Sequence, residues 1–248
     1  MVLRTAFVSC PLIIVLLRAP FATAQEPTPP VQEEESKTTT IQRVRDLPAE
    51  WLIGPYIPSG LPLEPLSNRQ RREVYIHQTF LSAQAYVARA FVAGIDQARG
   101  TPSQWGGGTS GYGQRFGSRY GSFVIASTFH SLGNAALGYE ARYDFCRCKG
   151  LEHRSLHAIA RNFVTYNRTE KQLRPAIPLY AGSFGAGMIS STWLPGHRNV
   201  WKDGTYGALV QAGYGSAINW VSEFSLDILR KITGNRYPPQ VGSQRSRR

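Results

Sequence analysis

The sequence predicts an all-α domain, built as a bundle of about five helices. Apolar residues recur at spacings of three and four, small residues recur at every fourth position in several segments, and little in the pattern indicates strands. We expect the helical domain to span residues 66–232. A signal peptide and a proline-rich arm precede it, and a basic tail follows it.

Residues 1–24 have the pattern of a secretory signal peptide. A basic start at Arg4 leads into an apolar run from Ala6 to Leu17, and the small residues of Ala22-Thr23-Ala24 are what signal peptidase cuts after. Arg18, near the end of the run, leaves an uncleaved membrane anchor as the alternative. The sequence therefore predicts an exported protein, located in the periplasm or associated with the outer membrane.

Residues 25–65 and 233–248 flank the predicted domain. The first range begins with EPTPPVQEEESKTTT, which predicts a disordered linker, and continues as an extended arm because its prolines break helices. Apolar residues in that arm, such as Trp51 and Ile57, need a surface to pack on. The C-terminal range has no apolar pattern and predicts a disordered basic tail.

The first helix of the domain is expected directly after Ser67, a residue suited to cap it. It runs to Gly100, where Thr101-Pro102 follows as a stop signal, and its apolar face comprises Leu81, Ala85, Ala88, Val92 and Ile95. Further helix-length apolar segments lie at residues 118–140, 151–166, 176–193 and 204–232, separated by polar turns.

The stretch YGQRFGSRYGS at residues 112–122 repeats a unit of aromatic, glycine, any residue and arginine. A phosphate-binding loop is excluded because no Gly-Lys-Ser/Thr follows and no strand precedes it. On a helix, Gly113, Gly117 and Gly121 lie along one side, and we expect them to form a packing seam against another helix. The same spacing recurs from Gly182 to Ser190 and from Gly204 to Ser216.

Positive charge is the main compositional bias, with 28 basic against 16 acidic side chains and a net charge of +12. Arg69, Arg71 and Arg72 crowd the first turn of a helix, where the helix dipole disfavours cations, so they are candidates for anion binding. An exported chain seldom meets nucleic acid. The expected partners are therefore membrane or envelope components with anionic lipid or polysaccharide, and a homo-oligomer is also allowed.

Three segments carry no Asp, Glu, Lys or Arg: residues 120–139, 175–197 and 204–222. Their lengths are close to the roughly 20 residues that a membrane-spanning helix needs. They are also rich in serine, glycine and proline, and the first contains His130 and Asn134. This moderate hydropathy favours a soluble bundle over a membrane-embedded or membrane-lying assembly, which remains the alternative.

The one candidate metal site combines Cys146 and Cys148 with His153 and His157, which share a helix face. Two thiolates and two imidazoles suit zinc, whereas a disulfide and two surface histidines are the competing interpretation. Ion pairing explains the acidic residues nearby, at positions 140, 144 and 152, and His130 fits a hydrogen-bonded core histidine. We identify no catalytic residue and no other cofactor, since no nucleophile elbow, HExxH or paired-carboxylate motif is present.

Glu140-Ala141-Arg142-Tyr143, a short basic turn, a helix and then GSFGAGMISSTWLP follow one another along the chain. In this order they resemble a poorly characterised family of secreted bacterial envelope proteins, over about residues 65–232. Members of that family have proline where Ala141 stands. The resemblance implies export and a shared fold, and it carries no activity over to this chain.

Together these patterns predict an exported, envelope-associated structural or interaction protein. Two alternatives stay open at the level of sequence. One is a periplasmic metal-dependent or hydrolytic enzyme that uses His153 and His157. The other is a module that binds anionic lipid or polysaccharide through Arg69, Arg71 and Arg72.

Overall fold

The structure is a computed structural model, and it describes residues 48–57, 64–196 and 198–234. The predicted signal peptide (1–24), most of the proline-rich arm and almost all of the basic tail lie outside the described residues. The described part is mainly helical, which confirms the all-α prediction, with one two-stranded sheet.

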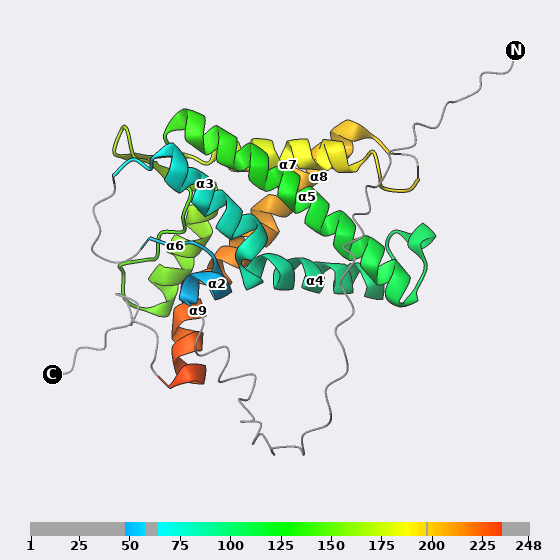
Figure 1. Ribbon diagram of the computed structural model, residues 1–248, viewed down its shortest axis with the longest axis horizontal. Helices are drawn as coiled ribbons and strands as arrows, with labels where there is room; N and C mark the ends of the chain where they lie inside the picture. Colours follow the sequence, from blue (N-terminus) through cyan, green and yellow to red (C-terminus); the bar gives the residue numbers. More distant parts are fainter. Residues whose placement is uncertain (1–47, 58–63, 197, 235–248) are drawn as a thin grey trace, which may run out of the picture. The chain divides into compact units, whose positions relative to one another are not determined.

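The described elements follow one another in this order: α2 (Ala49–Ile53), α3 (Asn68–Ile76), the π-helix η1 (His77–Leu81), α4 (Ala83–Ala98), the 3-10 turn η2 (Ser103–Trp105), α5 (Gly108–Leu137), α6 (Leu151–Phe163), β1 (Val164–Asn167), β2 (Gln172–Pro175), α7 (Ile177–Ser190), α8 (Val200–Val210), the π-helix η3 (Gln211–Gly215) and α9 (Ser216–Thr233). The long helix α5 packs against α4 on one side and α7 on another, and α8 lies along α7 (Figure 1). Helix α6 packs on α9.

The arm residues 48–57 contain a helical turn, α2, where an extended chain was expected. Their apolar side chains do find a surface: Ala49 and Leu226 of α9 form the centre of a small hydrophobic cluster. Leu52, Ile53 and Tyr56 pack around this pair from the arm. Burial against α9 therefore supports one helical turn between the prolines.

The single helix expected from Ser67 to Gly100 is instead three elements. Its start is as predicted, because the Ser67 side chain accepts from the Gln70 N–H and the Gln70 side chain accepts from the Ser67 N–H, forming a capping box. The helix then widens into η1 and breaks at Ser82, which has extended backbone angles. The Tyr120 hydroxyl on α5 donates to the carbonyl of Thr79 at 2.9 Å, and so provides a partner for a carbonyl inside the π-turn.

Residues 112–122 lie within α5, so the stretch is helical as predicted. Its two arginines organise the preceding loop. Arg115 is 1% exposed and donates to the carbonyls of Thr101, Pro102 and Gly106 at 2.8 to 2.9 Å. Arg119 makes a two-point ion pair with Asp96 of α4, at 2.6 and 3.0 Å.

The predicted seam of Gly113, Gly117 and Gly121 has no helix packed against it in the described part of the chain. A Cβ atom added at Gly113 or Gly117 would meet no described atom within 4 Å, and one at Gly121 would only touch Trp193 at 4.0 Å. These glycines share a helix side, but no backbone approaches that side in the described part of the chain.

The close helix contacts lie instead at the other small-residue segments. A Cβ at Gly182 of α7 would lie 2.7 Å from the carbonyl oxygen of Ala126 on α5. One at Gly207 of α8 would lie 2.5 Å from the carbonyl oxygen of Ser183 on α7, and Gly187 faces the carbonyl of Asp203. Backbone contact of this kind holds α5, α7 and α8 together.

The sequence-based assignment missed a β-hairpin. Strands β1 and β2 pair antiparallel, with Val164 opposite Pro175 and Asn167 opposite Gln172. The Asn167 side chain accepts from the N–H groups of Thr169 and Glu170, both at 2.9 Å, and so stabilises the turn. The helix expected over residues 151–166 therefore ends at Phe163.

The charge-free segments at residues 120–139, 175–197 and 204–222 lie in α5, in α7 and the loop after it, and in α8 to α9. Within the ranges that the structure describes, none of the helices is both long enough and apolar enough to cross a membrane.

Candidate functional site

The densest gathering of charged side chains surrounds the turn between α5 and α6, residues 138–150. Glu140 is buried there and pairs with Arg142 at 3.2 Å and with Arg168 from the hairpin. It also accepts from the backbone N–H of Ala141 and of Arg142, both at 3.0 Å. These donors fix the orientation of the carboxylate, so Glu140 anchors the turn.

Of the three arginines predicted to bind anions, Arg71 reaches this turn, and both Arg71 and Arg69 are used within the domain. Arg71 donates to the carbonyls of Asn134 and Tyr139 at 3.1 and 3.0 Å, which satisfies the C-terminal end of α5. Arg69 pairs with Glu73 at 2.9 Å, and Arg72 lies on the exposed side of α3. The structure therefore does not bring the three guanidinium groups together as one anion site.

A second buried acid, Glu223 of α9, faces the same turn from the other side. Its side chain is 0% exposed and accepts from Arg154 Nε at 3.1 Å, from the Tyr143 hydroxyl at 3.1 Å and from the Cys146 N–H at 3.1 Å. Burial and the adjacent Glu223 carboxylate raise the pKa of Tyr143 well above its usual range, so this hydroxyl stays protonated and donates.

The predicted zinc ligands do not assemble as expected. Cys146 and Cys148 form a disulfide with each other, so neither sulfur is a thiolate. His157 donates from Nε2 to the carbonyl of Asp144 at 2.8 Å, and the Asp144 carboxylate pairs with Arg161. In the described part of the chain, no three His, Cys, Asp or Glu side chains are grouped so as to hold a metal ion. The competing interpretation, a disulfide, matches what the structure contains.

His130 lies in α5 beside Asn134, whose amide nitrogen is 3.0 Å from His130 Nε2. Burial lowers the pKa of His130 to about 4. The ring is therefore neutral at physiological pH, and its Nε2 accepts from the amide. This arrangement agrees with the prediction of a hydrogen-bonded core histidine.

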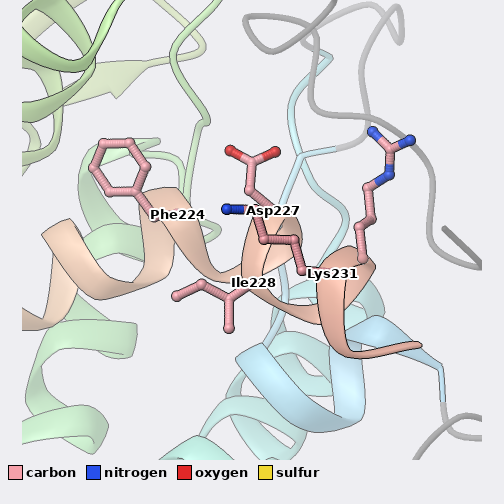
Figure 2. Close-up of a pocket in the computed structure, with 5 residues that line it drawn as sticks. Phe224, Asp227, Ile228 and Lys231 are labelled. Carbon is pink, nitrogen blue, oxygen red and sulfur yellow. The ribbon is translucent and has the colours of Figure 1, made fainter. Parts of the chain in front are cut away.

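A depression on the described surface follows α9 and has a volume of about 490 Å³. Phe224, Asp227, Ile228 and Lys231 line it, and Figure 2 shows them projecting from the same helix. Asp227 already pairs with Arg154 at 2.8 Å. Because one helix supplies the lining, the depression is an open groove and offers no converging polar groups for a small substrate.

The residues that sequence reasoning missed are the buried polar ones. Among the described residues, the largest fully buried side chains are those of Arg115, Glu223, Asn134, Asn162, Thr79 and Ser82. One signal was available: Glu223 is the first charged residue after the charge-free range 204–222, and an isolated charge in such a helix usually faces a buried partner.

The surface is correspondingly apolar. Large side chains such as Trp201, Leu209, Val87 and Phe91 are each about two-thirds exposed. In water-soluble domains, valine, leucine and phenylalanine are among the residue types most often buried. We call this arrangement, in which charged and amide side chains such as Arg115 and Asn162 are buried while large aliphatic and aromatic ones are exposed, inverted polarity; charged side chains such as Arg72 and Lys202 are exposed as well.

Comparison of the chain with protein-family models, with curated proteins and with solved structures finds no match. The resemblance to secreted bacterial proteins therefore stays a prediction, and the functional conclusion depends on the geometry described above.

Proposed function

We propose that this chain is an exported, envelope-associated structural or interaction protein. The observation that carries the proposal is the inverted polarity of the helical domain. Exposed aliphatic and aromatic side chains cost free energy in water, roughly 25 cal/mol per Å² of apolar surface. A domain that places them outside while burying Arg115 and Glu223 is built to work with its surface covered.

Two further features support export. The N-terminal residues have the signal-peptide pattern, and Cys146 and Cys148 are joined in a disulfide. Disulfides persist in oxidising compartments such as the periplasm and are rare in the cytosol. The enzyme and anionic-ligand alternatives gain no specific observation from the described residues, and both stay predictions.

Cell fractionation tests this proposal. The full chain, tagged at its C-terminus and expressed in a bacterium with two membranes, is followed through osmotic shock, carbonate washing and detergent extraction. We expect a processed chain that sediments with the envelope, while a soluble periplasmic marker protein is released by osmotic shock. Recovery of the chain in the cytosol, or its release together with the marker, would contradict the proposal.

A further inference from the structure

We propose that the outer faces of α4, α6 and the α8–α9 segment contact the acyl chains of a lipid bilayer. The inference rests on the proposed envelope association and identifies what covers the apolar surface. Acyl contact on several faces needs the domain to be partly immersed in the bilayer, and it does not require any one of the described helices to cross the bilayer.

Helix α6 shows the inversion most directly. Its buried face consists of Arg154, Ala158 and Asn162, each four residues from the next. From Leu156 to its end, its exposed residues are Leu156, Ile159, Ala160 and Phe163, whereas the exposed residues of its first turn include Glu152 and His153. An amphipathic helix on the surface of a water-soluble domain has the opposite arrangement.

Helix α4 repeats the pattern. Its two charged residues face α5: the Arg89 guanidinium lies 3.6 Å from the centre of the Phe123 ring, and Asp96 pairs with Arg119. Val87 and Phe91, four residues apart, point outward and are 67% and 66% exposed. The outward face of this helix therefore presents hydrocarbon and no charge.

The α8–α9 segment also exposes large apolar side chains, and it does so over a longer stretch of the chain. Trp201 and Leu209 of α8 are 69% and 67% exposed, and Trp220 and Val221 of α9 are also exposed. Glu223, two residues after Val221, is buried and bound by Arg154. Glu223 thus faces inward and these large apolar groups face outward, while Lys202 and Lys231 are exposed on the same segment.

Hydrogen bonding on these faces supplies an independent argument. The exposed Trp220 donates its Nε1–H to Ser155 Oγ at 2.9 Å, and the exposed Thr205 hydroxyl donates to the carbonyl of Trp201 at 2.9 Å. The hydroxyl of Tyr86 likewise donates to the carbonyl of Phe80 at 2.7 Å. Water would satisfy such groups without any protein partner, whereas hydrocarbon requires internal partners.

The spread of the apolar residues favours lipid over a second copy of the chain. Among the described residues, 26 large hydrophobic side chains are exposed, and they occur on helices from α2 to α9, on β2 and in the loop after α7. A typical interface covers one patch of about 20 to 30 residues of all kinds on each partner. Helices α4, α6 and α8 pack on different neighbours and lie at separate edges of the domain (Figure 1). One partner copy would cover only part of this surface, while acyl chains adapt to several faces.

Vesicle flotation provides the first test. The full chain is transferred from detergent into uncharged phosphatidylcholine vesicles, at low salt and at about 1 M salt. We expect binding in both conditions, because hydrocarbon contact does not depend on charge. Leu156→Glu should weaken binding about tenfold, whereas Gln114→Glu, which adds the same charge at an exposed polar site, should leave it unchanged. Circular dichroism spectra of both variants serve to check that their helix content is unchanged.

Fluorescence quenching by phosphatidylcholine with brominated acyl chains provides the second test, and it needs no disruptive substitution. We expect strong quenching of the wild-type tryptophans. Trp201→Phe should remove a large part of it, and Trp105→Phe, in the η2 turn, should remove little.

Three outcomes would overturn the inference. Binding that appears only with anionic vesicles and vanishes at high salt would mean recognition of headgroups. Absence of quenching together with Leu156→Glu abolishing self-association would mean that a second copy covers these faces. In a third outcome, the chain sediments with the envelope in cells, carbonate releases it, and brominated lipid does not quench its tryptophan fluorescence. That result would exclude acyl contact but would agree with the proposed envelope association. A chain outside the envelope would instead remove the proposed function itself.

Discussion

Arg154 binds both the side-chain carboxylate and the main-chain carbonyl of Glu223. Its Nε donates to the Glu223 carboxylate at 3.1 Å, and its Nη2 donates to the Glu223 carbonyl at 2.7 Å. The same guanidinium reaches Asp227 at 2.8 Å. Because a planar guanidinium presents its donors in fixed directions, these contacts set how α6 lies along α9.

Removing the charge of Glu223 should destabilise the domain. Glu223→Gln keeps the shape of the side chain but leaves the buried Arg154 short of a counter-ion, and breaking a buried pair costs about 3 to 5 kcal/mol. We expect a loss of about 3 kcal/mol in the free energy of unfolding, measured by urea titration in mild detergent. Glu152→Gln on the exposed side of α6 is the matched control and should change stability by less than about 0.5 kcal/mol. Equal effects of the two changes would show that the buried pair does not anchor α9.

Two glycines give a second prediction: replacing each by alanine should change the stability of the domain in opposite directions. Gly207→Ala places a methyl group 2.5 Å from the Ser183 carbonyl oxygen, and overpacking of this kind costs about 1 to 3 kcal/mol. Gly117→Ala meets no described atom within 4 Å and should stabilise α5 by up to about 1 kcal/mol, because alanine favours helix. Thermal unfolding of both variants measures the difference. A destabilising Gly117→Ala would indicate that a partner outside the described residues packs on that side.

Local signals explain what the sequence predicted correctly. Ser67 and Gln70 cap a helix by themselves, so that start was predictable from a few residues. The break at Ser82 was not, because the π-turn before it depends on Tyr120, about 40 residues further along the chain. Spacing likewise shows that Gly113 and Gly117 share a helix side, but it contains no information on which helix, if any, lies opposite.

The buried polar groups were unpredictable for the same reason. Arg154 and Glu223 are 69 positions apart, and only the packing of α6 on α9 brings them together. The zinc prediction rested on a pattern of shorter range. The spacing of Cys146 and Cys148 was compatible with both a ligand pair and a disulfide, and the structure contains the disulfide. His157 is bound to a backbone carbonyl in the same turn.

Thiol titration tests this assignment. The chain processed after Ala24 keeps only Cys146 and Cys148, so when it is unfolded without reductant it should show no free thiol, and two thiols after reduction. Cys146→Ser should free the Cys148 thiol, so the number of thiols titrated without reductant should rise by one. Zinc measured on the same samples completes the test. Stoichiometric zinc in the unreduced wild-type chain, lost in His157→Ala, would restore the metal site.

His130 should make stability depend on pH in a defined window. Its pKa is lowered to about 4 in the folded state, against about 6.5 in an unfolded chain, so the unfolded state binds the proton more readily. The stabilising contribution is therefore complete above pH 6.5 and is lost as the pH falls toward 4, by up to about 3 kcal/mol in total. Urea titrations at several pH values, on wild type and on His130→Gln, isolate this contribution from that of the carboxylates. Parallel pH profiles of the two proteins would contradict the assignment.

Asn162 controls the second π-turn, η3. Its amide nitrogen lies 3.1 Å from the carbonyls of Gln211 and Ala212, which the widened helix leaves available. Asn162→Asp removes these donors without changing shape, and an unsatisfied buried group costs about 1 to 3 kcal/mol. We expect a loss in that range and faster amide hydrogen exchange over residues 211–216.

Asn199 offers the matched control for this change. Its side chain caps α8 by accepting from the Lys202 N–H at 3.1 Å, and an aspartate accepts equally well. Asn199→Asp should therefore be neutral or slightly stabilising, because a negative charge also favours the N-terminus of a helix. Two identical chemical changes then separate a donor role from an acceptor role. If hydrogen exchange in η3 were unaffected by Asn162→Asp, the π-turn would have to be maintained by the packing of Gly215 and its neighbours, and not by the amide of Asn162.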